Sequence, residues 1–407
     1  MGFHQYANGF QAVPKLGLDR IGDLLHRLGD PQKSLSCIHV AGTNGKGSVC
    51  MLLDGMLRAD GRRVGRYLSP NLKKVNERIA VNGEEIGDGD LSRLLSEIEG
   101  AAGETEKATG IAPTPFEIWT AAAFLYFKER ECDTVVLEVG MGGKYDATNV
   151  IDDCALAVIT RLDLDHTAYL GNTLGEVAEN KAGILKPRRP AVVAAQEEEA
   201  MAVLRRRARE LSCPLLVATP PAPRGFREIY ETFRFPDGEE VTLSLGGLHQ
   251  LENAAVAVLA AETLGVSRAA IVHGLTTARH PARLELLRDG AVPTLFDGGH
   301  NPNGIAALTR ALDRYYPGRE ETVIFACMED KDIGPSLGML DNGHRRFVFT
   351  TVENNPRAMT AEALKGKAAA LGIEGESAPT LGEARRLAES YGRPILIAGS
   401  LYLYGDL

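Results

Sequence analysis

A glycine-rich segment between an apolar run and an amphipathic run constrains the fold of this chain more than any other part. Residues 42–48 read Gly-Thr-Asn-Gly-Lys-Gly-Ser, after the apolar residues 38–41 and before the amphipathic residues 49–58. Glycine allows such a loop to turn its backbone N–H groups inward around phosphate oxygens, and the N-terminus of the following helix adds positive potential. The order of strand, loop, lysine, serine and helix therefore predicts a nucleoside triphosphate site in an α/β fold.

Two side chains of this segment have the chemistry that a triphosphate needs. Lys46 supplies a mobile cation for the outer phosphates, and the Ser48 hydroxyl can bind Mg²⁺. The alternative is an ordinary glycine-rich turn, because Gly42 lies only three residues before Gly45, which is tighter than the usual spacing. The order of the elements nevertheless favours the triphosphate site. The residues expected to contact the triphosphate in this loop are Thr43, Asn44, Gly45, Lys46, Gly47 and Ser48.

The composition is that of a globular protein with more than one domain. At 407 residues the chain is long enough for two or three domains of about 150 residues each. The net charge of −9 argues against non-specific nucleic-acid binding and gives no reason to expect an anionic membrane surface as partner. The six cysteines include no C-x-x-C pair, so we expect no disulfide framework, no zinc site and a reducing, cytoplasmic location. No apolar stretch approaches the ~20 residues of a membrane span.

Short apolar runs alternate with helical patterns along most of the chain. Apolar runs typical of buried strands include residues 133–139 and 155–160. This alternation predicts a mostly parallel sheet covered by helices on both faces. Residues 226–245 break the rhythm with a hairpin pattern around Pro236-Asp237-Gly238, and a new series of strands and helices begins near residue 280. The expected organisation is a first domain at residues 1–278, a linker at 279–283 and a second domain at 284–407.

A carboxylate and an imidazole follow two apolar runs that we expect to be neighbouring strands. Glu138 lies near the end of the run at 133–139, and His166 follows the run at 155–160. In an open α/β sheet, ligands bind beyond the carboxyl ends of the strands. A carboxylate among apolar and glycine neighbours is costly to bury unless it is paired or binds a cation. Both residues are therefore metal candidates, with a buried salt bridge as the alternative for Glu138 and a structural histidine as the alternative for His166.

Other polar residues have roles that the residue pattern leaves open. Lys181 lies on a helix with an apolar face, where a solvated lysine is the plainer interpretation. Asp297 and His300 lie in a second glycine-rich turn, which is either a capped tight turn or a clamp on the nucleotide across a cleft. Arg283, at the expected linker, could reach the same phosphates, although such an arginine is usually a surface residue. From the residues alone we expect a Mg²⁺-dependent phosphoryl-transfer enzyme with its site between two α/β domains and an acceptor of unknown kind.

The ordered motifs of this chain resemble those of the folylpolyglutamate synthase/dihydrofolate synthase family of the Mur ligase superfamily. The matching strings are GTNGKGS at 42–48, TPFE at 114–117, EVGMGGKYDATNV at 138–150, LDHTAYLGNTLGEVAENKAGILKP at 164–187, HQLENAAVA at 249–257, ARLELL at 282–287 and DGGHNPNG at 297–304. The resemblance implies a P-loop domain with a six-stranded core sheet and a small accessory sheet, followed by a smaller Rossmann-like domain. It implies an enzyme that uses ATP to phosphorylate a folate or dihydropteroate carboxylate. The amine of L-glutamate then attacks the acyl phosphate, and the products include ADP and phosphate.

The resemblance also implies roles for individual residues. Lys46, His166 and Lys181 would be catalytic, and Lys181 matches a lysine that the family carries in carbamylated form. Two Mg²⁺ ions are implied, whereas a role for K⁺ is left undecided. We expect a monomer whose partners are small molecules: ATP, L-glutamate and the folate-type acceptor. The implied metal ligands are Ser48, Ser69, Glu138 and His166; the implied ATP contacts beyond the loop are Asn253, Arg283, Asp297 and His300; and the residues that would border the folate are Thr114 and Phe116.

The chain departs from the family pattern at several positions. Asn71 stands where histidine is common, Lys144 replaces a frequent arginine, Asp163 replaces glycine, and Gly299 replaces alanine. None of these is an expected metal ligand, so they bear on the folate side and on the stiffness of the Asp297 turn. Two alternative functions stay open at this point. One is a Mur-type amino-acid ligase of cell-wall precursors, and the other is a P-loop kinase or NTPase that forms no amide.

Overall fold

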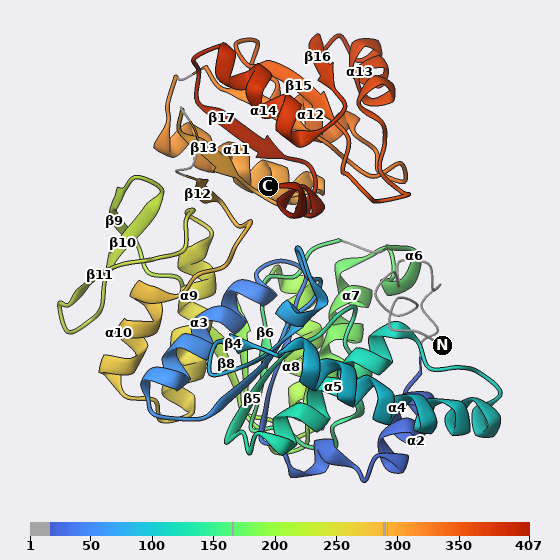
Figure 1. Ribbon diagram of the computed structural model, residues 1–407. Helices are drawn as coiled ribbons and strands as arrows, with labels where there is room; N and C mark the ends of the chain where they lie inside the picture. Colours follow the sequence, from blue (N-terminus) through green and yellow to red (C-terminus); the bar gives the residue numbers. More distant parts are fainter. Residues whose placement is uncertain (1–16, 165–166, 288–289, 291, 319) are drawn as a thin grey trace. The chain divides into compact units, whose positions relative to one another are not determined.

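The computed structural model describes residues 17–164, 167–287, 290, 292–318 and 320–407 (Figure 1). These residues form two compact units, each with helices and a parallel-rich sheet of its own. Among the described residues, unit 1 contains those up to Ala222 together with Leu251–Ala278, and unit 2 contains those of Pro223–Gln250 and Arg279–Leu407. The α/β fold expected from the alternation of strands and helices is confirmed.

Unit 1 is built on one mostly parallel sheet. Its strands are β1 (Cys37–Ala41), β2 (Val64–Tyr67), β3 (Ile79–Val81), β4 (Glu84–Glu85), β5 (Thr134–Glu138), β6 (Leu156–Ile159), β7 (Ala191–Ala194) and β8 (Leu215–Ala218). The order in this eight-stranded sheet is β4-β3-β2-β5-β1-β6-β7-β8, and β3 and β4 form an antiparallel hairpin at one edge. Eight strands less these two leave a six-stranded parallel core, as the family resemblance implies. The hairpin turns at Asn82-Gly83, a pair that favours such turns.

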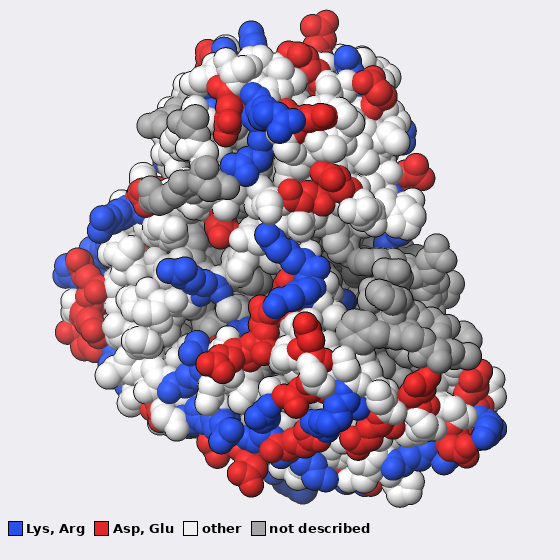
Figure 2. Space-filling view, in the orientation of Figure 1, with Lys and Arg blue, Asp and Glu red and all other residues white. Residues whose placement is uncertain are grey.

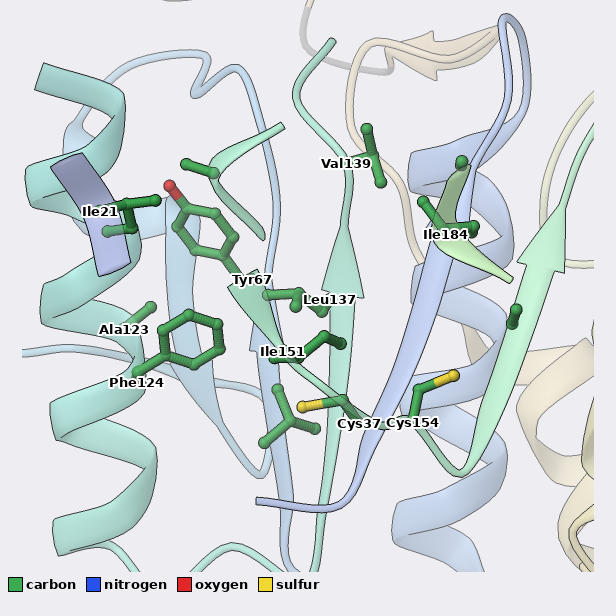
Figure 3. Packing of buried hydrophobic residues seen from close by; sticks show 14 of the residues in the cluster. Ile21, Cys37, Tyr67, Ala123, Phe124, Leu137, Val139, Ile151, Cys154 and Ile184 are labelled. Carbon is green, nitrogen blue, oxygen red and sulfur yellow. The ribbon is translucent and has the colours of Figure 1, made fainter. Parts of the chain in front are cut away.

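Helices cover both faces of this sheet. Alternate residues of a strand point to opposite faces of the sheet. On one face, Cys37 and Leu137 belong to a core cluster that also contains residues of α4 and α5. On that side Phe124 of α5 and Tyr67 of β2 lie among the apolar side chains of the strands (Figure 3). The other face is covered by α3, which contacts β1, β2 and β5. The helices are α2 (Asp19–Arg27), α3 (Lys46–Ala59), α4 (Asp88–Thr109), α5 (Pro115–Glu129), α6 (Thr167–Leu170), α7 (Leu174–Lys181), α8 (Glu198–Glu210), α9 (Gln250–Thr263) and α10 (Arg268–Thr277).

Helices α3 and α10 approach closely because glycines lie at their contact. A Cβ atom on Gly274 would lie 2.4 Å from the Cγ atom of Met56, and one on Gly55 would lie 3.4 Å from the Cα atom of Gly274. Only glycine permits backbones to come this near without displacing side chains. Residues 251–278 therefore complete unit 1, since α10 packs directly on the helix that follows the glycine-rich loop.

Unit 2 has a second parallel-rich sheet with the order β12-β13-β17-β14-β15-β16. Strand β12 is antiparallel to β13, and the others are parallel. A core cluster joins one face to α11, α12 and α13, and α14 also contacts the strands. The elements are β12 (Glu285–Leu287), β13 (Thr294–Phe296), β14 (Thr322–Phe325), β15 (Arg346–Thr350), β16 (Gly375–Ala378), β17 (Ile395–Ala398), α11 (Pro302–Tyr315), α12 (Gly334–Leu340), α13 (Ala361–Ala370), α14 (Leu381–Ser390) and the 3₁₀ turn η5 (Leu401–Asp406).

A small three-stranded sheet also belongs to unit 2. It comprises β9 (Pro223–Arg227), β10 (Tyr230–Arg234) and β11 (Glu240–Thr242), in the order β11-β10-β9. Glu231 of β10 is fully buried and accepts hydrogen bonds from Arg314 at 2.5 and 2.9 Å and from the Tyr315 hydroxyl at 2.6 Å. Because a buried carboxylate needs such partners, these bonds fix the small sheet against α11.

The grouping of residues 223–250 with unit 2 differs from the expected organisation, which places them in the first domain. The hairpin pattern predicts the strands correctly but does not show which core they pack on, and here Glu231 packs against α11. The chain does pass between units at Ala278 and Arg279, next to the expected linker. The division into 1–278, 279–283 and 284–407 stays a prediction. In the part of the chain that the structure describes, no helix is long and apolar enough to cross a membrane.

Candidate active site

The glycine-rich loop joins the end of β1 to the start of α3, as the sequence predicts. Gly42 and Gly45 have φ angles of 152° and 90°. A Cβ atom on Gly42 would lie 1.8 Å from the Oγ1 atom of Thr160, and one on Gly45 would lie 2.1 Å from the Oδ1 atom of Asn253. Both glycines are therefore required by close neighbours as well as by the turn. The contact at Gly45 also brings Asn253, an expected ATP contact, to the loop.

The first half of the loop is hydrogen-bonded to the segment after β6. The N–H groups of Thr43 and Asn44 donate to the carbonyl oxygen of Arg161 at 3.0 and 3.2 Å. The Thr43 hydroxyl bonds to the backbone of Asp163, and the Thr160 hydroxyl donates to the Asn44 carbonyl oxygen at 2.7 Å. In this structure Arg161 thus accepts from both N–H groups, and the expected contacts of Thr43 and Asn44 with the triphosphate stay a prediction.

Two lysine side chains meet at one carbonyl oxygen of the loop. The Nζ atom of Lys46 donates to the carbonyl oxygens of Gly42 at 3.0 Å and Thr43 at 3.2 Å. The Nζ atom of Lys181 donates to the same Gly42 oxygen at 2.8 Å, and Lys181 is buried. The interpretation of Lys181 as a solvated helix residue is therefore wrong. The structure places both lysines at the loop where the sequence predicts the triphosphate.

Glu138 lies at the carboxyl end of β5, beside Val40 at the end of β1. Its side chain is 4% exposed, and its Oε2 atom accepts a hydrogen bond from the backbone N–H of Ser69 at 2.9 Å. Ser48, in the first turn of α3, is also buried. Carboxylate and hydroxyl oxygens are the ligands that Mg²⁺ prefers, and such sites usually have one or two carboxylates, with water and phosphate completing the shell. The residues present therefore fit a Mg²⁺ ion. His166, the other expected ligand, lies outside the described residues.

The loop after Glu138 folds back over the strand ends and brings further expected residues to this edge of the sheet. A Cβ atom on Gly140 would lie 2.5 Å from the ring of Phe116, and one on Gly143 would lie 3.0 Å from the Cα atom of Lys181. The N–H group of Lys144 donates to the carbonyl oxygen of Asn180 at 2.9 Å. The glycines of this loop thus allow the backbone to pass between Phe116 and α7. The loop therefore packs against the end of α7, where Lys181 lies.

Sequence reasoning did not single out a buried polar chain behind this loop. Asp146 accepts hydrogen bonds from the N–H groups of Met141 and Thr148 and from the Thr148 hydroxyl. That hydroxyl lies 2.8 Å from the Nε2 atom of His39 on β1. Burial raises the pKa of the Asp146 carboxyl, against the effect of these hydrogen bonds, and burial lowers the pKa of His39 to about 3. A histidine within an otherwise apolar strand is the signal that could have indicated this chain.

Thr114 and Phe116, the expected folate-side residues, lie at the start of α5. The N–H group of Glu117 donates to the Thr114 hydroxyl at 3.3 Å, and the Thr114 N–H donates to the Glu117 carboxylate at 2.7 Å, which is a capping box. The Nε atom of Arg20 donates to the same carboxylate at 3.1 Å. The ring of Phe116 lies 6.0 Å from that of Tyr67. The Thr114 hydroxyl therefore caps a helix, whereas the Phe116 ring lies beside the Gly140 turn.

In unit 2 the second glycine-rich turn follows β13 and leads into α11. Asp297 is 9% exposed. Its Oδ2 atom accepts a hydrogen bond from the N–H of Leu284, and its Oδ1 atom accepts one from the N–H of Gly299, both at 2.8 Å. The Nδ1 atom of His300 lies 3.0 Å from the carbonyl oxygen of Gly298. Asp297 therefore holds its own turn and the segment that carries Arg283. Asn301 caps α11, as the interpretation of a capped turn expects, and His300 is exposed. The interpretation of this turn as a clamp on the nucleotide stays a prediction.

The expected site residues that the structure describes thus form two sets. In unit 1 the glycine-rich loop, Ser69, Glu138 and Lys181 lie at the carboxyl ends of parallel strands, which is where open α/β sheets bind ligands. In unit 2 Arg283, Asp297 and His300 lie close together in and beside one turn. On the face of the molecule shown in Figure 2, acidic and basic side chains are interspersed.

Comparison with known proteins identifies the family of this chain. The profile of the Mur ligase middle domain matches residues 40–261, and that of the Mur ligase glutamate ligase domain matches residues 282–401. The dihydrofolate synthase/folylpolyglutamate synthase of Bacillus subtilis is 34% identical over 415 residues, which cover 97% of this chain and 94% of the relative.

Solved structures agree with this result over nearly the whole chain. The Mycobacterium tuberculosis folylpolyglutamate synthase complexed with ADP and AMPPCP has a TM-score of 0.88 at 31% identity, covering 96% of this chain and 94% of that chain. Escherichia coli FolC in complex with DHPP and ADP has a TM-score of 0.84 at 31% identity, covering 99% and 94%. The chain therefore belongs to the Mur ligase family and, within it, to the dihydrofolate synthases and folylpolyglutamate synthases.

Proposed function

We propose that this chain is an ATP-dependent ligase that adds L-glutamate to the carboxylate of a folate or of dihydropteroate. The observation that carries the proposal is the convergence of Lys46, Lys181 and Glu138 at one sheet edge, in a chain with full-length similarity to folate ligases. Relatives with ADP, AMPPCP and DHPP in their structures support ATP and a pterin acid as ligands of this chain. The same similarity favours the folate branch over the two alternatives, a cell-wall ligase and a P-loop kinase or NTPase.

The reaction needs an activated carboxylate, because a free carboxylate resists attack by an amine. An oxygen of the acceptor carboxylate attacks the γ-phosphorus of ATP, the bond to the β-phosphate oxygen breaks, and ADP leaves. The glutamate nitrogen then attacks the acyl carbon, the carbon–oxygen bond to phosphate breaks, and the amine loses a proton. The Lys46 ammonium group and the N–H groups at the start of α3 would stabilise the negative charge that develops on the phosphate oxygens.

Mg²⁺ is the proposed metal cofactor, and its ligands in unit 1 would be Ser48, Ser69 and Glu138. When bound, it would neutralise phosphate charge and orient the terminal phosphate for transfer. His166 is proposed as a further ligand, which would suit a second Mg²⁺ ion. The hydrogen bond from the Ser69 N–H to Glu138 holds two of these residues beside each other.

Carbamylation of Lys181 is also part of the proposal. Its amine lies buried at the Gly42 carbonyl oxygen, which Lys46 shares, so two ammonium groups crowd one acceptor. Like charges at such a place are unfavourable in a low-dielectric environment. The ammonium group would first lose a proton; the neutral amine would then attack CO₂, form an N–C bond and release a second proton. One cation would thus be replaced with an anion able to help hold a second Mg²⁺. Whether K⁺ supports the reaction is a separate question, which can be tested by replacing K⁺ with another monovalent cation in the activity assay.

The remaining expected residues are proposed to bind substrates. Asn253 would contact the nucleotide from its position on Gly45, and Arg283, Asp297 and His300 of unit 2 would contribute to ATP binding. Phe116 would border the folate acceptor, with Thr114 fixing the start of its helix. We further propose that the protein acts as a monomer in the cytoplasm.

The test of this function is a coupled assay for phosphate release from ATP. Release should require both L-glutamate and dihydropteroate or a reduced folate, and mass spectrometry should find the glutamyl amide. Lys46→Ala should abolish turnover while the circular dichroism spectrum stays unchanged. Turnover only with UDP-linked muramyl substrates would instead place the chain in the cell-wall branch, and a stable phosphorylated acceptor would indicate a kinase.

A further inference from the structure

Arg283 lies between two residues with left-handed backbone conformations. Ala282 has a φ angle of 60° and Leu284 one of 40°, and neither is glycine. A left-handed conformation is unfavourable for residues with a Cβ atom, because that atom comes too close to the following carbonyl oxygen. Both side chains are buried, with exposed fractions of 0% and 1%, whereas Arg283 itself is half-buried. Strain of this kind persists only where surrounding groups determine the backbone strongly.

Hydrogen bonds from two directions fix the backbone on both sides of Arg283. On one side, the N–H of Ala282 donates to the Oε2 atom of Glu285 at 2.8 Å, and the carbonyl oxygen of Ala282 accepts from the N–H of Gly298 at 2.8 Å. On the other side, the N–H of Leu284 donates to Asp297 at 2.8 Å. Charged acceptors make the bonds to Glu285 and Asp297 stronger than ordinary backbone bonds. The two flanking residues therefore cannot relax independently.

Glu285 is itself held in place from the C-terminal turn η5. The Tyr404 hydroxyl donates to the Oε1 atom of Glu285 at 3.3 Å. The Tyr404 ring packs edge-on against Phe296 at 5.1 Å, and Phe296 lies opposite Glu285 in the β12–β13 pair. Each oxygen of the Glu285 carboxylate thus has a defined partner, one in the segment before Arg283 and one in η5.

We propose that Glu285 is a positioning residue for Arg283, and that Tyr404 orients Glu285 for this task. The carboxylate holds the Ala282 N–H and with it the strained backbone from which the guanidinium group extends. A guanidinium group on a pre-organised backbone loses less conformational entropy when it binds an anion than one on a relaxed backbone. The anion is a phosphate group of ATP, so the inference rests on the proposed function of Arg283.

A double-mutant cycle with ATP as the varied substrate tests the proposal. Glu285→Ala should raise the KM for ATP by about 10-fold or more, because small misplacements of a binding group cost this much. The KM for L-glutamate should not change. Glu285→Gln keeps an oxygen that can accept from Ala282 and should retain most of the ATP affinity, and Tyr404→Phe should give a smaller effect of the same kind. Glu374→Ala, at an exposed position of unit 2, is the matched control.

The decisive measurement adds Glu285→Ala to Arg283→Ala. If Glu285 acts through Arg283, the double variant should have the same KM for ATP as Arg283→Ala alone. Multiplied effects in the double variant would show that Glu285 only stabilises the fold and would overturn the inference. An unchanged KM for ATP in Arg283→Ala would overturn the proposed role of Arg283 itself, and the inference with it. A raised KM in Arg283→Ala together with a normal one in Glu285→Ala would overturn the positioning role alone.

Discussion

His39 provides a quantitative test of the buried polar chain behind the active-site loops. It is fully buried on β1, the strand that leads into the glycine-rich loop. The Thr148 hydroxyl donates to Asp146, so it accepts from the Nε2–H of a neutral His39. Within the described part of the chain, the Nδ1 atom of His39 has no hydrogen-bond partner. Protonation would therefore place an unsatisfied N–H group and a charge in the core, which agrees with the lowering of the His39 pKa to about 3 by burial.

The size of the effect follows from proton linkage. A histidine whose pKa falls from 6.5 when unfolded to about 3 when folded contributes stability that is fully present above pH 6.5 and is lost as the pH falls toward 3. Lowering the pH from about 7 to about 5 should therefore reduce the free energy of unfolding by about 2 kcal/mol through His39 alone. Asp146, whose pKa burial raises, acts in the opposite direction.

Urea denaturation followed by tryptophan fluorescence can measure this difference. The chain has one tryptophan, Trp119, which is buried in α5 and so reports on unit 1. His39→Gln removes the titration and keeps a side-chain donor for Thr148, and His26→Gln, at an exposed histidine of α2, is the matched control. The wild type and the control should lose about 2 kcal/mol more than His39→Gln between the two pH values. Equal losses in all three proteins would refute the assignment of a neutral, unpaired His39.

Three further substitutions test the site and unit 2. Gly42→Ala would place a Cβ atom 1.8 Å from Thr160 and should lower kcat/KM for ATP by about 100-fold or more. The control Gly103→Ala, at an open helix position, should have no effect. Near-normal kinetics of Gly42→Ala would contradict the steric argument. Glu138→Gln removes the charge but keeps an acceptor for Ser69, so the Mg²⁺ concentration at half-maximal activity should rise by about 10-fold or more. An unchanged Mg²⁺ dependence would remove Glu138 from the metal site. Glu231→Gln breaks a buried ion pair with Arg314 and should destabilise unit 2 by about 3 kcal/mol or more, as measured by thermal unfolding. An unchanged unfolding temperature would show that the stability of unit 2 does not require this ion pair.

The glycine-rich loop could be predicted because its chemistry and its geometry lie in one short segment. Seven consecutive residues specify the turn, the cation and the start of α3. Glu138 could also be predicted, because residues at the carboxyl ends of neighbouring parallel strands meet at one edge. Thr114 shows the limit of a motif. The pattern Thr-x-x-Glu is a capping box that local sequence already indicates, and the structure uses it as one.

Contacts between distant segments could not be predicted in this way. Thr160 and Asn253 explain why Gly42 and Gly45 must be glycine, yet nothing near either partner in the sequence points to the loop. The sequence also predicts that residues 223–250 belong to the first domain, whereas the structure groups them with unit 2. A hairpin pattern predicts the strands themselves. Which core they pack on depends on the contact of Glu231 with α11, a helix that comes later in the chain. In both cases a partner that is distant in the sequence, and not local propensity, determines which residue a position requires or which core a segment packs on.

The strained segment around Arg283 shows why a matching motif does not by itself guarantee a matching site. Residues 282–287 read Ala-Arg-Leu-Glu-Leu-Leu, and without glycine this pattern favours ordinary extended backbone. The left-handed conformations of Ala282 and Leu284 arise because Glu285 and Asp297 supply acceptors for their N–H groups. A chain that kept the arginine but lost either acid would relax this backbone and aim the guanidinium group elsewhere. The position of Arg283 is therefore a property of three acidic and aromatic partners in the folded unit, and the arginine alone does not determine it.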